Sequence, residues 1–390
     1  MTGFNLVRKA LVVAGTAILL AGCKVIPDGG GTASTGPAVD TSAPAPEPSA
    51  TALPTDQTRH RVALLVPLSG SNAAVGQSIA NATTMALLDT NASNLRITTY
   101  DTAAGAREAA RKAVQDGNKL ILGPLLSENV TLVLAEARPA NVPIISYSND
   151  ESVAAPDVFV MGHLPGQSIR RSVAYAKSKG ARNVAAIVPE GEYGQRAELA
   201  LTNALRAEGM ALAGIEQYSR GNTSIVSASR RLQARGGYDS VLIADGARLV
   251  IQAAGVLKPS GSGSAQLMGT ELLSGESAVT SASAMRGLIF SAVSDNRFKR
   301  FSDSYNSRFG GQPYRIATLG YDSVLLALRV AQDWRVGSSF PTGRLYAEDG
   351  FLGLDGAFRF GRNGVVDRAM EVREVRAGQV VIIDAAPTQF

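Results

Sequence analysis

Short apolar runs alternate with amphipathic stretches along the chain from Arg61 onward. Val62–Val66 is a continuous apolar run, which is followed by a turn over Pro67–Gly70 and then by apolar residues at helical spacing. A strand that is apolar on both faces is typical of a parallel sheet covered by helices on both sides. The same pattern predicts strands at 96–100, 119–122, 142–146 and 158–161, with helices at 106–116 and around 130–134.

A second series of the same kind follows Met161. Two predicted helices end at Gly180 and Gly209, and glycine commonly follows the end of a helix. The pattern predicts further strands at 183–188, 211–215, 240–244, 266–269 and 287–292, a late helix at 317–334, and a β-hairpin made of 370–375 and 379–383. We therefore predict an α/β fold with two doubly wound parallel-sheet lobes and a cleft between them.

The amino terminus has the layout of a secretory signal. Arg8 and Lys9 precede an apolar stretch from Ala10 to Leu20, and the tetrad Leu20–Cys23 resembles a bacterial lipobox, in which the cysteine is acylated and becomes the new amino terminus. The alternative is a transmembrane anchor, but an apolar stretch of about 11 residues is too short to cross roughly 30 Å of hydrocarbon. Residues 1–22 are thus predicted to be a signal peptide, and Cys23 is the predicted lipidation site.

Residues 23–59 differ in composition from everything that follows. Proline recurs among Gly, Ser, Thr and Ala, and no aromatic residue is present. Such a segment cannot bury enough apolar surface to offset its conformational entropy. We predict a disordered tether that spans on the order of 35 Å as a flexible coil.

The charge pattern bears on possible partners, and the cysteine content bears on how the fold is stabilised. The formal net charge is +5, and removal of the predicted signal peptide takes away Arg8 and Lys9 but no acidic residue. Lys and Arg are otherwise scattered among Asp and Glu, so nucleic-acid binding is not predicted. Cys23 is the single cysteine, so no disulfide can form within the chain and stability must come from burial.

Catalytic and metal-binding motifs are missing from the sequence. His60 and His163 are the only histidines, and they are not spaced as metal ligands. The chain has no Gly-x-Ser-x-Gly elbow, no Walker-type phosphate loop and no Gly-x-Gly-x-x-Gly after a strand. We predict that the protein is not an enzyme and that it uses neither a cofactor nor a metal.

Several local motifs resemble those of type I periplasmic binding proteins of the leucine/isoleucine/valine-binding class. They are Val62–Gly70 with Val75–Gln77, Tyr100–Asp101, Tyr193–Gly194 and Met268–Glu271. The resemblance implies two lobes joined by three crossings of the chain. It implies one lobe of 60–162 with 295–340 and a second of 163–294 with 341–390.

A narrower resemblance is to penicillin-binding-protein activators, which are outer-membrane lipoproteins. Its motifs are Gly123–Leu126 with Asn129–Val130, Gly194–Arg196, Tyr321–Asp322, Thr342–Gly343 and Asp355–Gly356. The longer members carry a helical-repeat domain before the binding-protein-like head, whereas this chain has the proline-rich tether in that place. The resemblance implies a bifunctional penicillin-binding protein as partner.

The amino-acid-binding class also implies a set of ligand residues. Ser127 matches a cleft hydroxyl that donates to a ligand carboxylate, and Ser148 to Asp150 match the loop after the fourth strand. Tyr193 matches a residue that covers the ligand, and Glu271 matches the acid that pairs with an ammonium group. Asp150 departs from the class, because it stands where a hydroxyl residue is usual. A carboxylate there repels a ligand carboxylate, which disfavours a free amino acid as the ligand.

Each of these residues also fits a purely structural role. Ser127 fits the N-cap of a helix that begins at Glu128, and Asp150 fits a turn residue. Tyr193 could end a loop against the core, and Glu271 needs a partner or solvent after its buried strand. The sequence leaves these alternatives open.

Two functions remain. In the first, the protein is held by its lipid in the periplasm, at the inner leaflet of the outer membrane, and activates a peptidoglycan synthase. Lys24 after the acylated cysteine is compatible with that placement. In the second, it is the substrate-binding lipoprotein of a branched-chain amino acid or amide ABC transporter and takes a small amino-acid-like ligand. The tether favours the first function, because a regulator held at one membrane needs reach to contact an enzyme in the other.

Overall fold

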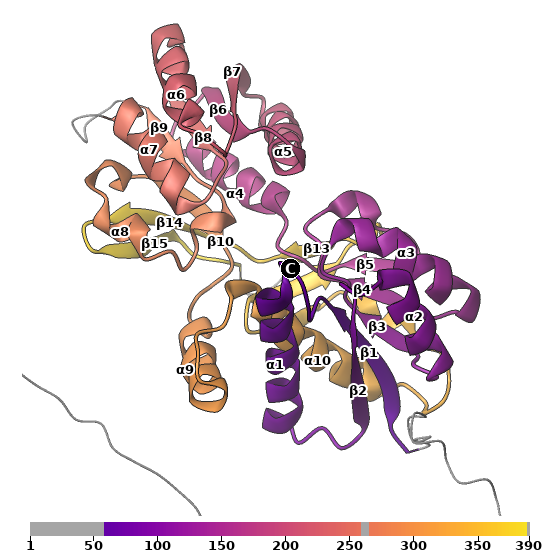
Figure 1. Ribbon diagram of the computed structural model, residues 1–390. Helices are drawn as coiled ribbons and strands as arrows, with labels where there is room; N and C mark the ends of the chain where they lie inside the picture. Colours follow the sequence, from indigo (N-terminus) through magenta and orange to yellow (C-terminus); the bar gives the residue numbers. More distant parts are fainter. Residues whose placement is uncertain (1–57, 259–264, 388–390) are drawn as a thin grey trace, which may run out of the picture. The chain divides into compact units, whose positions relative to one another are not determined.

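The computed structural model describes residues 58–258 and 265–387 of the chain (Figure 1). The predicted signal peptide, Cys23 and nearly all of the predicted tether lie outside the described residues. The described part contains two large β-sheets and one small one.

The first large sheet has five parallel strands in the order β2-β1-β3-β4-β5. Its strand β1 shows why the apolar run predicted there is continuous. Val62, Leu64 and Val66 point into one core, and Ala63 and Leu65 point into another on the opposite face. The strands are β1 (His60–Val66), β2 (Leu95–Asp101), β3 (Leu120–Leu122), β4 (Ile144–Ser146) and β5 (Val158–Val160).

Helices cover both faces of this sheet. On one face α2 (Ala106–Gln115) packs beside α3 (Ser127–Ala137), and on the other α1 (Ala73–Asp89) packs beside α10 (Thr318–Ala331). Helix α9 (Phe298–Phe309) also contacts α1.

The second large sheet has seven strands in the order β15-β14-β10-β9-β8-β6-β7. All neighbours are parallel except the β10–β14 and β14–β15 pairs, so the predicted C-terminal hairpin is confirmed as β14 and β15. The strands are β6 (Asn183–Pro189), β7 (Ala211–Tyr218), β8 (Ser240–Ile243), β9 (Gln266–Met268), β10 (Ile289–Ala292), β14 (Glu371–Arg376) and β15 (Gln379–Asp384).

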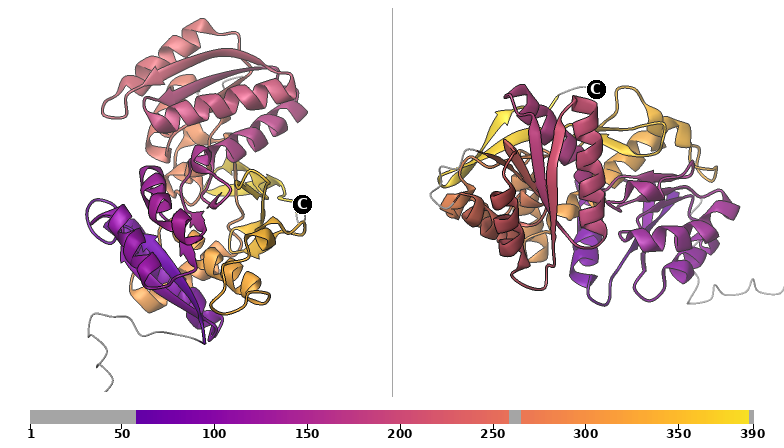
Figure 2. Two further views of the ribbon diagram at one scale, coloured as in Figure 1. Left: turned by 90° about the vertical axis from the view of Figure 1, so that its right-hand side faces the viewer. Right: turned by 90° about the horizontal axis from the view of Figure 1, so that it is seen from above.

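Helices again cover both faces of the second sheet, as can be followed in Figure 2. Helices α4 (Pro165–Ser178) and α5 (Glu192–Glu208) line one core, and α6 (Ser224–Arg235) and α7 (Ala247–Leu257) line the other. A short helix, α8 (Ala278–Ser281), completes the set. These two covered sheets confirm the predicted α/β fold with two lobes.

A third, antiparallel sheet is a feature that the sequence analysis did not predict. It consists of β11 (Phe351–Gly353), β12 (Gly356–Phe360) and β13 (Val366–Arg368). Phe358, Phe360 and Val366 lie in the same core as Phe159 of the first sheet. The expected boundary, which gave all of 341–390 to the second lobe, therefore needs correction: 345–366 packs on the first sheet, and the segment joins the second sheet only at β14.

The chain passes between the two large sheets three times. The crossings lie between β5 and α4, between β10 and α9, and between β13 and β14. The first two crossings follow the carboxyl ends of β5 and β10, which each have a parallel neighbour in their own sheet. Ligands of α/β proteins commonly bind at the carboxyl ends of parallel strands.

Candidate functional site

The predicted ligand residues all follow the carboxyl ends of strands. Ser127 is the first residue of α3, after β3, and Ser148 and Asp150 follow β4. Tyr193 stands at the start of α5, after β6, and Glu271 begins a 3₁₀ turn, Glu271–Leu273, after β9. Helix α3 has Leu126 at its N-cap and no side-chain capping hydrogen bond, so the structure does not support Ser127 as the cap.

Ser148 shapes the loop that follows β4. Its hydroxyl is buried and accepts a hydrogen bond from the Asp150 amide at 3.0 Å, and its own amide donates to the Ser146 hydroxyl at 3.1 Å. These two bonds fold the loop back on itself. The chemistry of Ser148 in this structure is therefore that of a turn residue.

Asp150 combines a turn role with an ion pair. It caps the 3₁₀ turn Glu151–Val153 by accepting hydrogen bonds from the Ser152 amide at 3.0 Å and the Ser152 hydroxyl at 2.7 Å. Arg196 Nη2 lies 2.8 Å from its other oxygen. Burial opposes ionisation, but the Ser152 hydrogen bonds and the Arg196 guanidinium lower the pKa of Asp150. The loop thus carries a fixed, already paired negative charge.

Arg196 is the residue that links this loop to the second sheet. From α5 it donates to Asn149 Oδ1 at 3.1 Å and to Glu192 Oε2 at 2.8 Å, in addition to Asp150. Gly194–Arg196 is one of the motifs that carry the resemblance, but no role was predicted for Arg196 from the sequence. A single basic residue in a helix does not reveal its partner, which lies in a different segment.

Tyr193 and Glu271 come together on the second lobe. The Tyr193 hydroxyl lies 2.9 Å from Thr270 Oγ1 and donates to Glu271 Oε1 at 3.4 Å. Glu271 Oε2 is buried and has no hydrogen-bond partner among the described residues. Burial raises the pKa of Glu271 to about 7. This carboxyl group therefore changes its protonation near neutral pH and has one oxygen that can accept a further hydrogen bond.

An anchored cation lies beside Tyr193. The Arg220 guanidinium is 5.4 Å from the centre of the Tyr193 ring, a cation–π contact. Arg220 Nε donates to Asp245 Oδ2 at 2.7 Å, and the Tyr218 hydroxyl donates to the same oxygen. Tyr193, Arg220 and Glu271 thus form one polar group, of which the sequence analysis found Tyr193 and Glu271.

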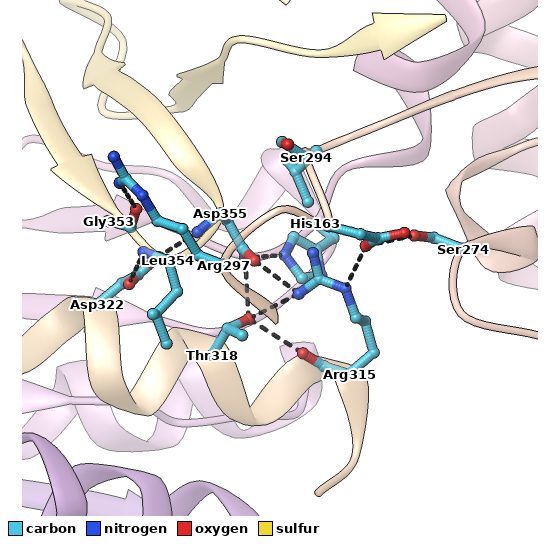
Figure 3. A network of polar contacts seen from close by, with 12 residues as sticks. His163, Ser274, Ser294, Arg297, Arg315, Thr318, Asp322, Gly353, Leu354 and Asp355 are labelled. Atoms are coloured by element: carbon cyan, nitrogen blue, oxygen red, sulfur yellow. Dashed lines mark hydrogen bonds and ion pairs between the residues drawn. The ribbon is translucent and has the colours of Figure 1, made fainter. Parts of the chain in front are cut away.

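A second polar group joins the crossing segments, and we call it the hinge cluster: His163, Arg315, Asp322, Asp355 and Arg368 (Figure 3 shows all but the last with a label). Asp355 is fully buried in the turn between β11 and β12. Its carboxylate accepts from Arg315 Nη1 at 2.6 Å and from the Thr318 hydroxyl at 2.9 Å, and His163 Nε2 lies 2.6 Å away.

Burial and neighbouring charges both shift the pKa values of the residues in the hinge cluster. Burial lowers the pKa of His163. Burial alone would raise the pKa of Asp355, but the neighbouring Arg315 guanidinium, the largest opposing influence, holds that pKa low. Burial and the neighbouring Asp355 raise the pKa of Asp322, which accepts hydrogen bonds from the Leu354 and Asp355 amides at 2.6 and 3.3 Å. One carboxylate thus stays ionised, and the other tends to hold its proton.

The hinge cluster contacts all three crossings. His163 lies on the first, and Arg368 at the end of β13 donates to the Met161 carbonyl at 2.7 Å, which ties the third crossing to the first. Asp295 on the second crossing pairs with Arg315 at 3.5 Å and with Arg373 of β14. The cluster therefore holds the three connecting segments to one another.

Comparison with protein families decides the class of this chain. The model of the periplasmic binding protein family matches residues 60–379. This chain belongs to the periplasmic binding protein family. The family assignment fits the two covered sheets, the three crossings and the polar residues gathered at the strand ends.

Individual relatives of this periplasmic binding protein are distant. An uncharacterized protein of Rickettsia prowazekii, RP748, is 30% identical over 182 residues, and the match covers 45% of this chain and 48% of that protein. The chain thus spans about half the length of this curated relative.

Two solved structures show the same fold. One is a protein of Rhodospirillum rubrum assigned to a branched-chain amino acid ABC transporter, with a TM-score of 0.71, 20% identity, and 83% of this chain and 100% of that chain covered. The other is the C-domain of LpoA from Haemophilus influenzae, a regulator of PBP1A, with a TM-score of 0.65, 20% identity, and 83% and 99% coverage. At this identity the likeness concerns the fold.

Two features are absent from the part of the chain that the structure describes. No helix there is both long and apolar enough to cross a membrane. No group of three or more His, Cys, Asp and Glu side chains there is arranged to hold a metal ion.

Proposed function

We propose that this periplasmic binding protein is a lipoprotein, acylated at Cys23, that binds a bifunctional penicillin-binding protein and stimulates peptidoglycan synthesis. It does so as a binding protein, without a catalytic role of its own. The observation that carries the proposal is the ion pair of Asp150 with Arg196 at the loop after β4.

The ion pair argues against capture of a free amino acid. In the amino-acid-binding class, the loop after β4 faces the ligand carboxylate. Here that loop carries an ionised Asp150, and like charges in a poorly solvated cleft repel each other. Arg196 does not offset this for a ligand, because it already contacts Asn149, Asp150 and Glu192.

The predicted anchor supports a regulator more than a solute carrier. A binding protein that delivers solute to a permease of the inner membrane gains nothing from attachment to the outer membrane. A regulator held by Cys23 can reach an enzyme in the inner membrane through the tether, which extends to roughly 120 Å when stretched. LpoA, whose C-domain has the same fold, is a regulator of PBP1A.

The test uses the acylated full-length chain in detergent and the bifunctional penicillin-binding proteins of the same organism. We expect one of them to bind the chain and to polymerise or crosslink glycan faster in its presence. Cys23→Ser is expected to abolish incorporation of labelled fatty acid and to release the chain from membranes. Absence of binding to every such synthase, or binding without any change in either rate, would contradict the proposal.

Capture of a small amino-acid-like ligand is the second candidate, and Glu271 favours it. Its buried Oε2 lacks a partner among the described residues, at the position that pairs with an ammonium group in the amino-acid-binding class. A ligand at 100 times its Kd stabilises a protein by roughly 2.7 kcal/mol, which is visible as a rise in Tm. A rise of that size with leucine or a similar amino acid, together with no effect on any synthase, supports this candidate instead.

A further inference from the structure

A groove separate from the Tyr193–Glu271 group lies along α5, and we call it the α5 groove. It has a volume of about 550 Å³ and is bounded by the loop 149–152, by 164–166 at the start of α4, and by the α5 side chains between Glu192 and Asn203. Of the predicted ligand residues, only Asp150 lines it. Segments of both lobes therefore contribute to its walls.

Two of the α5 residues that line the groove, Leu199 and Ala200, form an accessible apolar patch. Leu199 is 61% exposed, although Leu164, which also lines the groove, is only 2% exposed. Pro165 and Ala200 extend the apolar lining. An exposed leucine is ordinary when it stands singly on a surface, but here it continues an apolar lining inside a groove.

The rim of the groove is acidic. Asp150, Glu151 and Glu192 line it, and Arg196 is the one basic side chain among the lining residues, all of which are described. Arg196 is already paired with Asp150 and Glu192, whereas Glu151 is exposed and has no ion pair in the described structure. The chain as a whole has a formal net charge of +5, so this acidic rim contrasts with the rest of the protein. It is complementary to a basic partner.

The shape of the groove favours a protein segment over a small solute. Sites for small molecules bury most of the ligand surface. Here Leu199, Glu192 and Glu151 remain exposed, so the groove is covered best by a partner that closes over it from outside. An apolar anchor with basic neighbours is a common form of such a segment.

We propose that the α5 groove docks a segment of the peptidoglycan synthase in which an apolar side chain is accompanied by Arg or Lys. This inference rests on the proposed function, because it names the surface through which that function is exerted. The apolar side chain packs against Leu199 and Ala200, and the cation meets Glu151 at the rim. Because the loop 149–152 and α5 both contact the segment, docking depends on residues of both lobes.

Leu199→Asp tests the apolar anchor, and Leu88→Asp is its matched control. Leu88 is 64% exposed on α1 and does not line the groove. With the acylated full-length chain, we expect Leu199→Asp to weaken binding to the synthase about tenfold or more, as at an interface hot spot. Leu88→Asp is expected to bind like the wild type, and circular dichroism melts establish that both variants are folded.

Glu151→Lys tests the acidic rim, with Glu276→Lys as an exposed control outside the groove. We expect Glu151→Lys to bind more weakly and to show a shallower dependence of affinity on salt, because one attractive charge has become repulsive. Glu276→Lys is expected to keep the wild-type affinity and salt dependence. Equal salt dependence of Glu151→Lys and wild type counts against a cationic occupant and overturns the proposal.

The remaining outcomes distinguish a failure of the groove proposal from a failure of the proposed function. If the wild type binds and stimulates the synthase and Leu199→Asp binds equally well, the groove proposal is overturned while the proposed function stands. If the wild type binds no synthase, the proposed function fails and the groove proposal falls with it. If Leu199→Asp instead dissociates a dimer of this chain, with synthase binding unchanged, the occupant is a second copy and the proposal is wrong.

Discussion

Single residues in this protein often satisfy two roles that the sequence presents as alternatives. Asp150 is both a turn residue and one half of an ion pair, because its two oxygens face Ser152 and Arg196 respectively. Glu271 has one oxygen near Tyr193 and one without a partner among the described residues. The environment of each oxygen, more than the residue type, decides the chemistry.

The Asp150–Arg196 pair is expected to stabilise the fold. In Arg196→Met, Asp150 keeps its partly buried charge but loses its partner, so we expect the free energy of unfolding to fall by about 1–2 kcal/mol in urea titrations. Arg107→Met is the control, because Arg107 pairs with Glu136 while half exposed, and its loss should cost about 0.5 kcal/mol or less. Equal stabilities of the two variants would show that Arg196 contributes no more than a surface charge.

Glu271 is expected to make stability depend on pH. Its pKa is about 7 in the folded protein and near 4.5 in the unfolded chain, so between these values the folded state binds more protons. Stability from this group is complete below about pH 4.5 and is lost as pH rises towards 7. The loss is of the order of 1–3 kcal/mol.

Comparison with Glu271→Gln isolates this effect from other titrating groups. The glutamine does not titrate, so the stability of the variant relative to wild type should increase between pH 5 and pH 7.5, measured by denaturant unfolding at each pH. Asp150 contributes a pH dependence of stability in the opposite direction, because its lowered pKa stabilises the fold at higher pH. This contribution is the same in both proteins and cancels in the difference. A difference that does not change with pH would show that Glu271 is solvated and ionised throughout.

Secondary structure elements were predictable where apolar periodicity is strong. The strand at 62–66 and the hairpin at 370–383 agree with β1, β14 and β15, because continuous or alternating apolar runs report burial directly. The predicted late helix at 317–334 is shorter in the structure, where α10 ends at Ala331. Trp334 is nevertheless buried, since it stacks on His60 beyond the helix.

The small sheet β11–β13 was not predictable from periodicity. Its strands are short, and Phe358 and Phe360 on β12 pack on residues of the first sheet that are distant in sequence. Contacts between segments that are distant in sequence also explain why only part of the candidate site was predictable. Tyr193 and Glu271 follow strand ends, which the pattern locates, whereas Arg196 and Arg220 become recognisable only through partners in other segments.

Phe358 tests whether β11–β13 belongs to the core of the first lobe. It is 1% exposed and contacts Phe351 and Phe360, so Phe358→Ala should lower the free energy of unfolding by about 3–5 kcal/mol. Leu352→Ala, at a position 60% exposed on β11, should change it by about 0.5 kcal/mol or less. Similar small effects of both substitutions in thermal and denaturant unfolding would mean that the small sheet adds little to that core.

At the scale of the whole folded part, charged side chains connect the segments where the chain passes between the sheets. Arg368 binds the Met161 carbonyl, and Asp295 pairs with Arg373, so each crossing segment is held by charged groups of another. Charged contacts are directional, and they therefore fix how the connecting segments lie against one another. Burying these charged side chains costs desolvation free energy, and their mutual ion pairs and hydrogen bonds oppose that cost.

Asp355→Asn removes the central charge of the hinge cluster. It leaves Arg368 buried without its counter-charge and leaves Arg315 with only the longer pair to Asp295 at 3.5 Å. We expect the free energy of unfolding to fall by about 3–5 kcal/mol, because breaking one side of a buried ion pair strands the other. Asp333→Asn is the control, since Asp333 pairs with Arg344 at the surface and its loss should cost about 1 kcal/mol or less. If Asp355→Asn proved as stable as Asp333→Asn, the cluster would be a tolerated group of charges, and apolar packing of the small sheet would have to hold the crossings in place.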